Sequence, residues 1–99
     1  MSSRLVKRRL DDVQRQLSQA RESLAVLEEQ VAVWNDALED ARIRALVSET
    51  PLQSKEYDEL SRHVVVANTE MARRAQEVRE LMTARDELLQ EWTPKDEHG

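Results

Sequence analysis

The stretch that decides the fold is residues 6–48, which read VKRRLDDVQRQLSQARESLAVLEEQVAVWNDALEDARIRALVS. Apolar residues recur in it at alternating steps of four and three, a spacing that averages 3.5 residues and is typical of a coiled-coil seam. No glycine or proline interrupts the pattern. The stretch therefore predicts one long helix that packs against another helix. Its seam residues are Val6, Leu10, Val13, Leu17, Ala20, Leu24, Leu27, Val31, Trp34, Leu38, Ala41 and Ala45.

A turn is expected after this helix, because the residue before a proline is pushed out of the helical region and Thr50 precedes Pro51. The same residues can start a second helix. Thr50 can be its N-cap, Pro51 suits the first helical position, and Gln53 can complete a capping box. Ser54 is an alternative N-cap.

The second half of the chain has a heptad of its own, which places two arginines on the seam. Its members are Tyr57, Leu60, Val64, Ala67, Met71, Arg74, Val78, Leu81, Arg85, Leu88 and Trp92. Two long helices joined by a short connection lie antiparallel, so facing residues should have numbers that add to about 102. That register places Trp34 over Ala67 and Met71, and Arg85 near Leu17.

These patterns predict an all-α fold, a single helical-hairpin domain over residues 1–99. We expect the first helix at about residues 5–47, a turn at about 48–53, a second helix at about 54–92 and a polar tail at 93–99. A chain of this size buries little in one seam, so two hairpins paired into a four-helix bundle are a plausible further layer.

Composition excludes several classes of site. Charged residues make up 35% of the chain and aromatic residues 3%, as in long helices rather than compact globules. Without cysteine there is no disulfide, thiolate zinc site or cysteine nucleophile. No apolar run reaches the roughly 18 residues of a membrane span, and we expect a cytoplasmic protein without membrane contact. Arginine outnumbers lysine, a bias common in GC-rich bacterial genomes.

Charge is distributed unevenly, although the net charge of the chain is -5. Residues 1–21 carry a net charge of +4, whereas residues 22–59 carry -7. The basic patch Arg4, Lys7, Arg8 and Arg9 lies at a helix N-terminus, where the helix dipole disfavours positive charge. Such a cluster indicates either an anionic partner, such as nucleic acid, or pairing with the acidic end of the second helix.

Apolar residues outside the two seams indicate a contact surface. In the first helix these are Ala25, Val26, Ala32 and Val33. In the second helix Ala75, Met82 and Leu89 form a stripe with a spacing of seven beside the seam. Together with the seam this stripe gives the width of apolar face found in bundle helices. We expect association with a protein partner or with a second copy.

Nothing in the sequence predicts catalysis, a cofactor or a metal. Glu59 and His63 stand one turn apart, but two ligands without a third are more often a solvated helix face than a metal site. The only glycine is the last residue, so there is no glycine-rich phosphate loop.

The predicted turn resembles the coiled-coil hairpin at the N-terminus of Gre-type transcript-cleavage factors. The resemblance lies in Ala41-Arg42, Ser48-Glu49 and Glu56-Tyr57. It implies a hairpin that enters the secondary channel of RNA polymerase, with Glu49 as one acidic tip residue and Tyr57 opening the second helix. The second tip acid of that family is replaced by Leu46, and the Glu-Tyr pair is displaced by four residues. The resemblance therefore implies polymerase binding without cleavage activity.

Three functions follow from these patterns. The preferred one is a non-catalytic coiled-coil module for protein interaction or regulation, self-associating as a homodimer. The second is a transcription regulator that docks on RNA polymerase or a sigma factor through the hairpin. The third is an electrostatic binder of nucleic acid that uses the basic patch.

Overall fold

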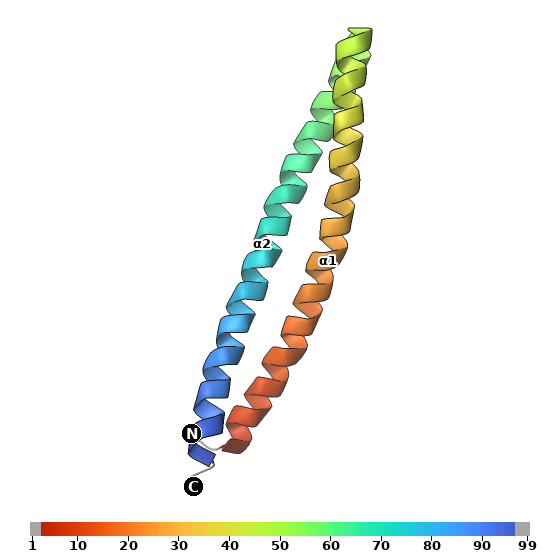
Figure 1. Ribbon diagram of the computed structural model, residues 1–99. Coiled ribbons are helices and arrows are strands. Elements are labelled where there is room, and N and C mark those ends of the chain that lie inside the picture. The colour runs from red at the N-terminus through yellow and green to blue at the C-terminus, as the bar shows by residue number, and fades with distance from the viewer. Residues whose placement is uncertain (1–2, 97–99) are drawn as a thin grey trace. The chain divides into compact units, whose positions relative to one another are not determined.

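The computed structural model describes residues 3–96, and their side chains as far as Trp92. Helix α1 spans Ser3–Ser48 and helix α2 spans Pro51–Asp96 (Figure 1). These two helices account for nearly all of the described residues, which confirms the predicted all-α helical hairpin. Neither helix, over the described residues, is both long and apolar enough to cross a membrane.

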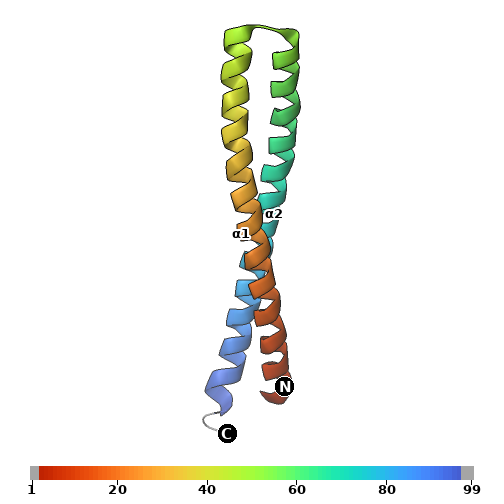
Figure 2. The ribbon, with the colours of Figure 1, turned by 90° about the vertical axis from the view of Figure 1, so that its right-hand side faces the viewer.

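The connection between the helices is shorter than predicted, because only Glu49 and Thr50 lie outside them (Figure 2). Thr50, rather than Ser54, is the N-cap of α2: the Gln53 backbone N–H donates to Thr50 Oγ1 at 3.2 Å. The Ser54 N–H donates to the Thr50 carbonyl at 3.1 Å, the first hydrogen bond of the helix. The predicted turn at 48–53 was therefore too long, and the predicted start of the second helix at 54 was three residues late.

Glu49 ends α1 in the left-handed region, with φ of 53°. Its N–H donates to the Ala45 carbonyl at 3.2 Å, which is the single hydrogen bond of an αL helix cap. The Ser48 hydroxyl donates to the Arg44 carbonyl at 2.6 Å and satisfies another acceptor of the last turn. A glutamate at this position is unusual, since glycine or asparagine normally occupies it.

The predicted helix ends also need correction. Helix α1 begins at Ser3 and includes Ser48, so it is longer than 5–47 at both ends. Helix α2 continues past Pro94 to Asp96 instead of ending near residue 92. Residues 93–96 of the predicted tail are thus helical, and residues 97–99 lie outside the described residues.

Contacts divide the chain into two compact units. Unit 1 combines the residues up to Ser23 with those from Arg74 onward, and unit 2 is Leu24–Arg73. Unit 2 therefore contains the connection and the adjoining parts of both helices, and unit 1 pairs the first part of α1 with the last part of α2. The prediction of a single domain stays a prediction.

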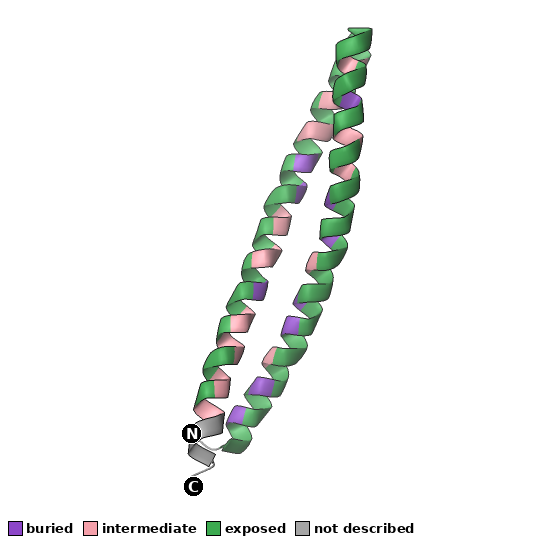
Figure 3. Cartoon of the chain, in the orientation of Figure 1, coloured by how far each residue is buried: buried purple, intermediate pink, exposed green. Residues whose placement is uncertain are grey.

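Within each unit the buried residues lie on the side of each helix that faces the other (Figure 3). All of the predicted seam residues of α1 and α2 are buried or half-buried. The most buried are Val6, Leu10, Leu17, Ala20 and Val78 in unit 1, and Leu27, Val31, Ala41, Val64 and Ala67 in unit 2. The 3.5-residue periodicity therefore identified the packed face of both helices.

Packing between the helices is seen in the part of unit 2 that lies farthest from the connection. Leu27, Val31 and Ala67 form a buried cluster, and Trp34 and Met71 pack against it half-buried. Trp34 thus packs against the cluster that contains Ala67, whereas its predicted placement over Met71 stays a prediction. Large residues lie against a small alanine there, as a filled seam requires.

The two seam arginines of unit 1 keep their charged ends at the edge of the seam. Arg74 donates to the carbonyl of Ser23 at 3.3 Å and to its hydroxyl at 3.1 Å, a hydrogen bond from α2 to α1. Arg85 extends along the seam and its guanidinium reaches Asp86 at 3.1 Å. Their aliphatic stems can therefore contribute to packing while their guanidinium groups remain hydrogen-bonded.

Candidate interaction surface

Exposed apolar residues are concentrated in unit 2. Among the described residues nine large apolar side chains are exposed, and eight of these belong to unit 2. They are Val26, Val33, Ile43, Leu46, Val47, Leu52, Val65 and Val66. Exposed apolar side chains that gather in one part of a small protein commonly mark a contact site. This distribution makes unit 2 the candidate site.

The first part of this surface is the α1 outer face, which we define as Ala25, Val26, Ala32 and Val33. All four predicted contact residues are exposed, with Val26 at 51% and Val33 at 65%. The two valines are seven residues apart, so they lie on the same side of α1. A hollow of about 460 Å³ beside them is also lined by Glu29, Gln30 and Trp34. An apolar side chain of a partner could enter this hollow next to the Trp34 ring.

The second part is the tip, which we define as Ile43, Leu46, Val47 and Leu52. These side chains are 47% to 80% exposed. These four apolar residues were not predicted as a surface, although the heptad places all of them outside the seam. The tip residue predicted from the family resemblance, Glu49, is exposed in the connection.

Tyr57, the other predicted tip residue, is half-buried. It belongs to the predicted seam of α2, six residues inside the start of that helix. Tyr57 is therefore less accessible to a partner than Glu49.

The third part is the α2 outer face, which we define as Val65 and Val66. Within the run Val64-Val65-Val66 only Val64 is buried, while Val65 is 62% and Val66 69% exposed. A helix turns by about 100° per residue, so three consecutive residues cannot all face one seam. The sequence allowed this outcome but did not identify the two exposed valines as a surface.

The predicted stripe Ala75, Met82 and Leu89 is less exposed than the α1 outer face. All three residues are half-buried within unit 1. They lie beside the seam, where packing between the helices covers part of each side chain. The stripe therefore offers less accessible apolar area than the valines of unit 2.

The predicted basic patch, Arg4, Lys7, Arg8 and Arg9, is exposed at the start of α1. Lys7 forms an ion pair with Asp11 at 3.1 Å, one turn along the same helix. Further along, Arg15 pairs with Asp12 at 3.2 Å. These acids offset part of the positive charge, and nucleic-acid binding by this segment stays a prediction.

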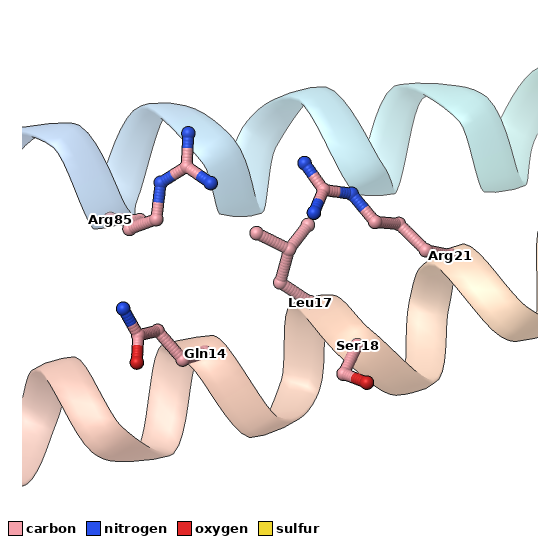
Figure 4. Close-up of a pocket in the computed structure, with 5 residues that line it drawn as sticks. All are labelled: Gln14, Leu17, Ser18, Arg21 and Arg85. Atoms are coloured by element: carbon pink, nitrogen blue, oxygen red, sulfur yellow. The ribbon is translucent and has the colours of Figure 1, made fainter.

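Unit 1 contains a shallow hollow that is lined mainly by polar and charged residues. It measures about 300 Å³ and is lined by Gln14, Leu17, Ser18, Arg21 and Arg85. Figure 4 shows the guanidinium groups of Arg21 and Arg85, one from each helix, on either side of the Leu17 side chain. The predicted proximity of Arg85 to Leu17 is thus confirmed.

Glu39 and Arg42 form an exposed pair on α1 in unit 2. Arg42 donates from Nη2 to Glu39 Oε1 at 2.6 Å and from Nε to Oε2 at 3.1 Å. These hydrogen bonds, and secondarily the charge of Arg42, lower the pKa of Glu39 below its ordinary value. The same contacts raise the pKa of Arg42.

His63 packs against an aromatic ring. Its ring centroid lies 4.5 Å from that of Trp34, with an edge-on angle of 74°. No group of three or more metal-ligating residues occurs within residues 3–96 as described. The interpretation of Glu59 and His63 as a helix face rather than a metal site stays a prediction.

Comparisons with protein-family models, with curated proteins and with solved structures find no match for this chain. Its candidate site therefore rests on the positions, exposure and charge of its own residues. By these measures the site is the exposed apolar surface of unit 2, made of the α1 outer face, the tip and the α2 outer face.

Proposed function

We propose that this chain is a non-catalytic coiled-coil module that binds protein partners, including a second copy of itself, through the exposed apolar surface of unit 2. The observation that carries the proposal is the presence of eight of the nine exposed large apolar side chains in unit 2. Covering apolar area releases roughly 25 cal/mol per Å². A surface that leaves valine and leucine side chains in water therefore gains free energy when a partner covers it.

The seam of the hairpin does not compete for this partner. The buried cluster of Leu27, Val31 and Ala67 already joins α1 to α2 in unit 2. The valines at 26 and 33 lie outside that cluster and are exposed. A partner can thus bind them without opening the hairpin, which supports a recognition role for the folded chain.

Sedimentation equilibrium over a wide concentration range tests the self-association. We expect the folded wild-type chain to associate, and the double variant Val26→Ser/Val33→Ser to associate at least tenfold more weakly, since burial of a valine is worth about 1.5 kcal/mol or more. Gln19→Ser, at an exposed polar position of α1 in unit 1, is the control and should behave as wild type. Circular dichroism verifies that each variant remains helical. A wild-type chain that stays monomeric up to about 1 mM would contradict self-association.

The tip supports a second candidate function, in which the end of the hairpin docks into an apolar groove of a larger protein. Val47 is 80% exposed, the highest value among the exposed large apolar residues of the described chain. RNA polymerase or a sigma factor is the partner to test first, on the basis of the sequence resemblance. We expect Leu46→Ser/Val47→Ser to abolish such binding to the purified partner, and Val65→Ser/Val66→Ser to leave it intact. Binding that survives the tip substitutions would contradict docking by the tip.

A further inference from the structure

The hollow of unit 1 brings together two arginines from different helices. The guanidinium groups of Arg21 on α1 and Arg85 on α2 lie on either side of the Leu17 side chain (Figure 4). The hollow measures about 300 Å³, and the described residues that line it include no acid. Two like charges from facing helices oppose the packing of those helices unless an anion lies near both. The lining of the hollow therefore has the charge of a site for a negatively charged group.

Arg85 is an unusual residue for the seam of a hairpin. Its side chain is only 24% exposed, so its charge is partly removed from water, which is costly without a partner. Nε donates to Oδ1 of Asp86 at 3.1 Å, and Nη2 lies 3.1 Å from the same oxygen. The other terminal nitrogen, Nη1, has no acceptor among the described residues. A guanidinium group has five N–H donors, so Arg85 retains donors for a ligand in the hollow.

Arg21 has no partner within the chain as described. It is exposed, and no hydrogen bond or ion pair joins it to another described residue. Gln14 adds a neutral side chain whose amide nitrogen is directed toward α2 in Figure 4. The Ser18 hydroxyl points away from both arginines there, and we assign it no role. Donors from both helices therefore line the hollow.

Acids near this level of the hairpin limit the affinity of the hollow for an anion but do not fill it. Asp86 is the acid of the described chain that pairs with Arg85, and its carboxylate is 61% exposed. It competes with a ligand for that arginine. The remaining acids of the same stretches of α1 and α2 pair with other bases or do not line the hollow; they are Asp11, Asp12, Glu22, Glu77, Glu80 and Glu87.

We propose that the hollow of unit 1 binds a phosphate dianion, either inorganic phosphate or the terminal phosphate group of a small molecule. A guanidinium group matches phosphate because two of its N–H groups donate in parallel to two phosphate oxygens. Two arginines match the charge of about -2 that a phosphate monoester carries at neutral pH, whereas a carboxylate carries a single charge. A volume of about 300 Å³ is at the small end of ligand pockets, which suits a group of this size.

A phosphate that contacts both arginines also links α1 to α2 in unit 1. A ligand that binds only the folded chain stabilises it, so phosphate should raise the urea midpoint of unfolding. Phosphate also stabilises proteins in general, because it is excluded from their surfaces. The specific effect is therefore the part of the increase that disappears when either arginine is replaced. This inference concerns unit 1 and does not depend on the binding of protein partners by unit 2.

NMR titration of the full chain with inorganic phosphate at pH 7.5 and constant ionic strength measures the binding. Glycerol 3-phosphate is the second ligand, and acetate is the singly charged comparison. Arg21→Gln and Arg85→Gln each remove one charge from the hollow, and Arg85→Lys keeps the charge without the paired donors. Arg79→Gln is the matched control, because it removes the same charge from an exposed position of α2, where Arg79 donates to Gln76 at 3.2 Å. Circular dichroism verifies that each variant remains helical.

We expect wild type to bind phosphate with a dissociation constant on the order of 1 mM, and each of the three variants at Arg21 and Arg85 to bind at least tenfold more weakly. Arg79→Gln should bind as wild type does, and Asp86→Asn should bind more tightly because the competing carboxylate is lost. Saturation by both phosphate ligands would support a site for phosphate in either form, and saturation by glycerol 3-phosphate alone would assign it to the small ester.

Three results would overturn the inference. The first is acetate binding as tight as phosphate binding, because a single charge would then suffice. The second is equal weakening by Arg79→Gln, which would show attraction to the whole chain rather than to the hollow. The third is a wild-type titration without saturable shifts up to about 50 mM of either phosphate ligand. None of these results would affect the proposed function, which is tested separately by sedimentation equilibrium.

Discussion

Leu27→Ala is the substitution whose cost follows most directly from the structure. Leu27 is 6% exposed and packs in the buried cluster of unit 2. The substitution removes three carbon groups, each worth about 0.8 kcal/mol of burial, or about 2.4 kcal/mol in total. The cavity term should be small, because the half-buried Trp34 and Met71 at the edge of the cluster can move inward. Alanine also favours the helix slightly more than leucine does. We therefore expect the free energy of unfolding to fall by about 2–3 kcal/mol.

Urea unfolding followed by the helical circular dichroism signal measures this change. With an m-value of about 1–2 kcal/mol per molar for a domain of this size, the midpoint should fall by at least about 1 M. Leu46→Ala is the matched control, because it removes the same atoms from the same helix at a position that is 64% exposed. Its cost should stay within about 0.5 kcal/mol. Equal costs for the two substitutions would refute the assignment of the buried seam.

Three further predictions concern the connection and the surface pair. Glu49→Gly should raise the free energy of unfolding by about 0.5 kcal/mol, since glycine adopts the positive φ of 53° without the cost of a side chain; a loss of stability in urea unfolding would contradict the αL cap. Thr50→Ala should lower it by about 1 kcal/mol, because the N-cap hydrogen bond to α2 is lost, and the same measurement should show Thr50→Ser to be nearly neutral. The lowered pKa of Glu39 means that its pair with Arg42 contributes stability above the ordinary carboxyl pKa of 4.5 and loses it as the pH falls through the pKa of the folded state. Arg42→Gln should return the Glu39 pKa toward 4.5 in an NMR titration, and an unchanged pKa would exclude Arg42 as the cause.

The sequence predicted the packed face of each helix well, because that face depends only on the spacing of apolar residues within the same helix. A step of 3.5 residues determines which side of a helix is apolar, whatever the partner is. Residues as different as Trp34 and Arg85 were therefore placed correctly on the seam. The antiparallel arrangement of the helices followed from the short connection alone. The predicted register was less accurate: facing residues were expected to have numbers that add to about 102, whereas the contacts Trp34–His63 and Arg74–Ser23 both add to 97.

The ends of the helices were harder to predict, since neighbouring residues offer competing signals. Thr50 and Ser54 both have the chemistry of an N-cap, and only the structure shows that Thr50 caps α2. Glu49 has no intrinsic preference for positive φ, so its role in ending α1 could not be read from its residue type. Pro94 suggested an earlier end to α2 than the structure has.

The candidate surface was predicted in part. Val26 and Val33 were recognised as apolar positions outside the seam, and both are exposed. The exposure of Leu46 and Val47 was not predicted, although both residues lie outside the heptad seam of α1. Whether Met82 is accessible depends on how far the facing helix covers it, and that is a property of packing rather than of heptad position.

The two-residue connection constrains how hairpins of this kind can change in length. An insertion into one helix alone would shift its apolar residues against the facing helix, and the connection is too short to absorb the displacement. An insertion of any number other than a multiple of seven would also rotate the seam away from its partner. A longer or shorter relative would therefore be expected to gain or lose whole heptads in both helices at the same level. In such a family each change in length would therefore add or remove about two helical turns in both helices together.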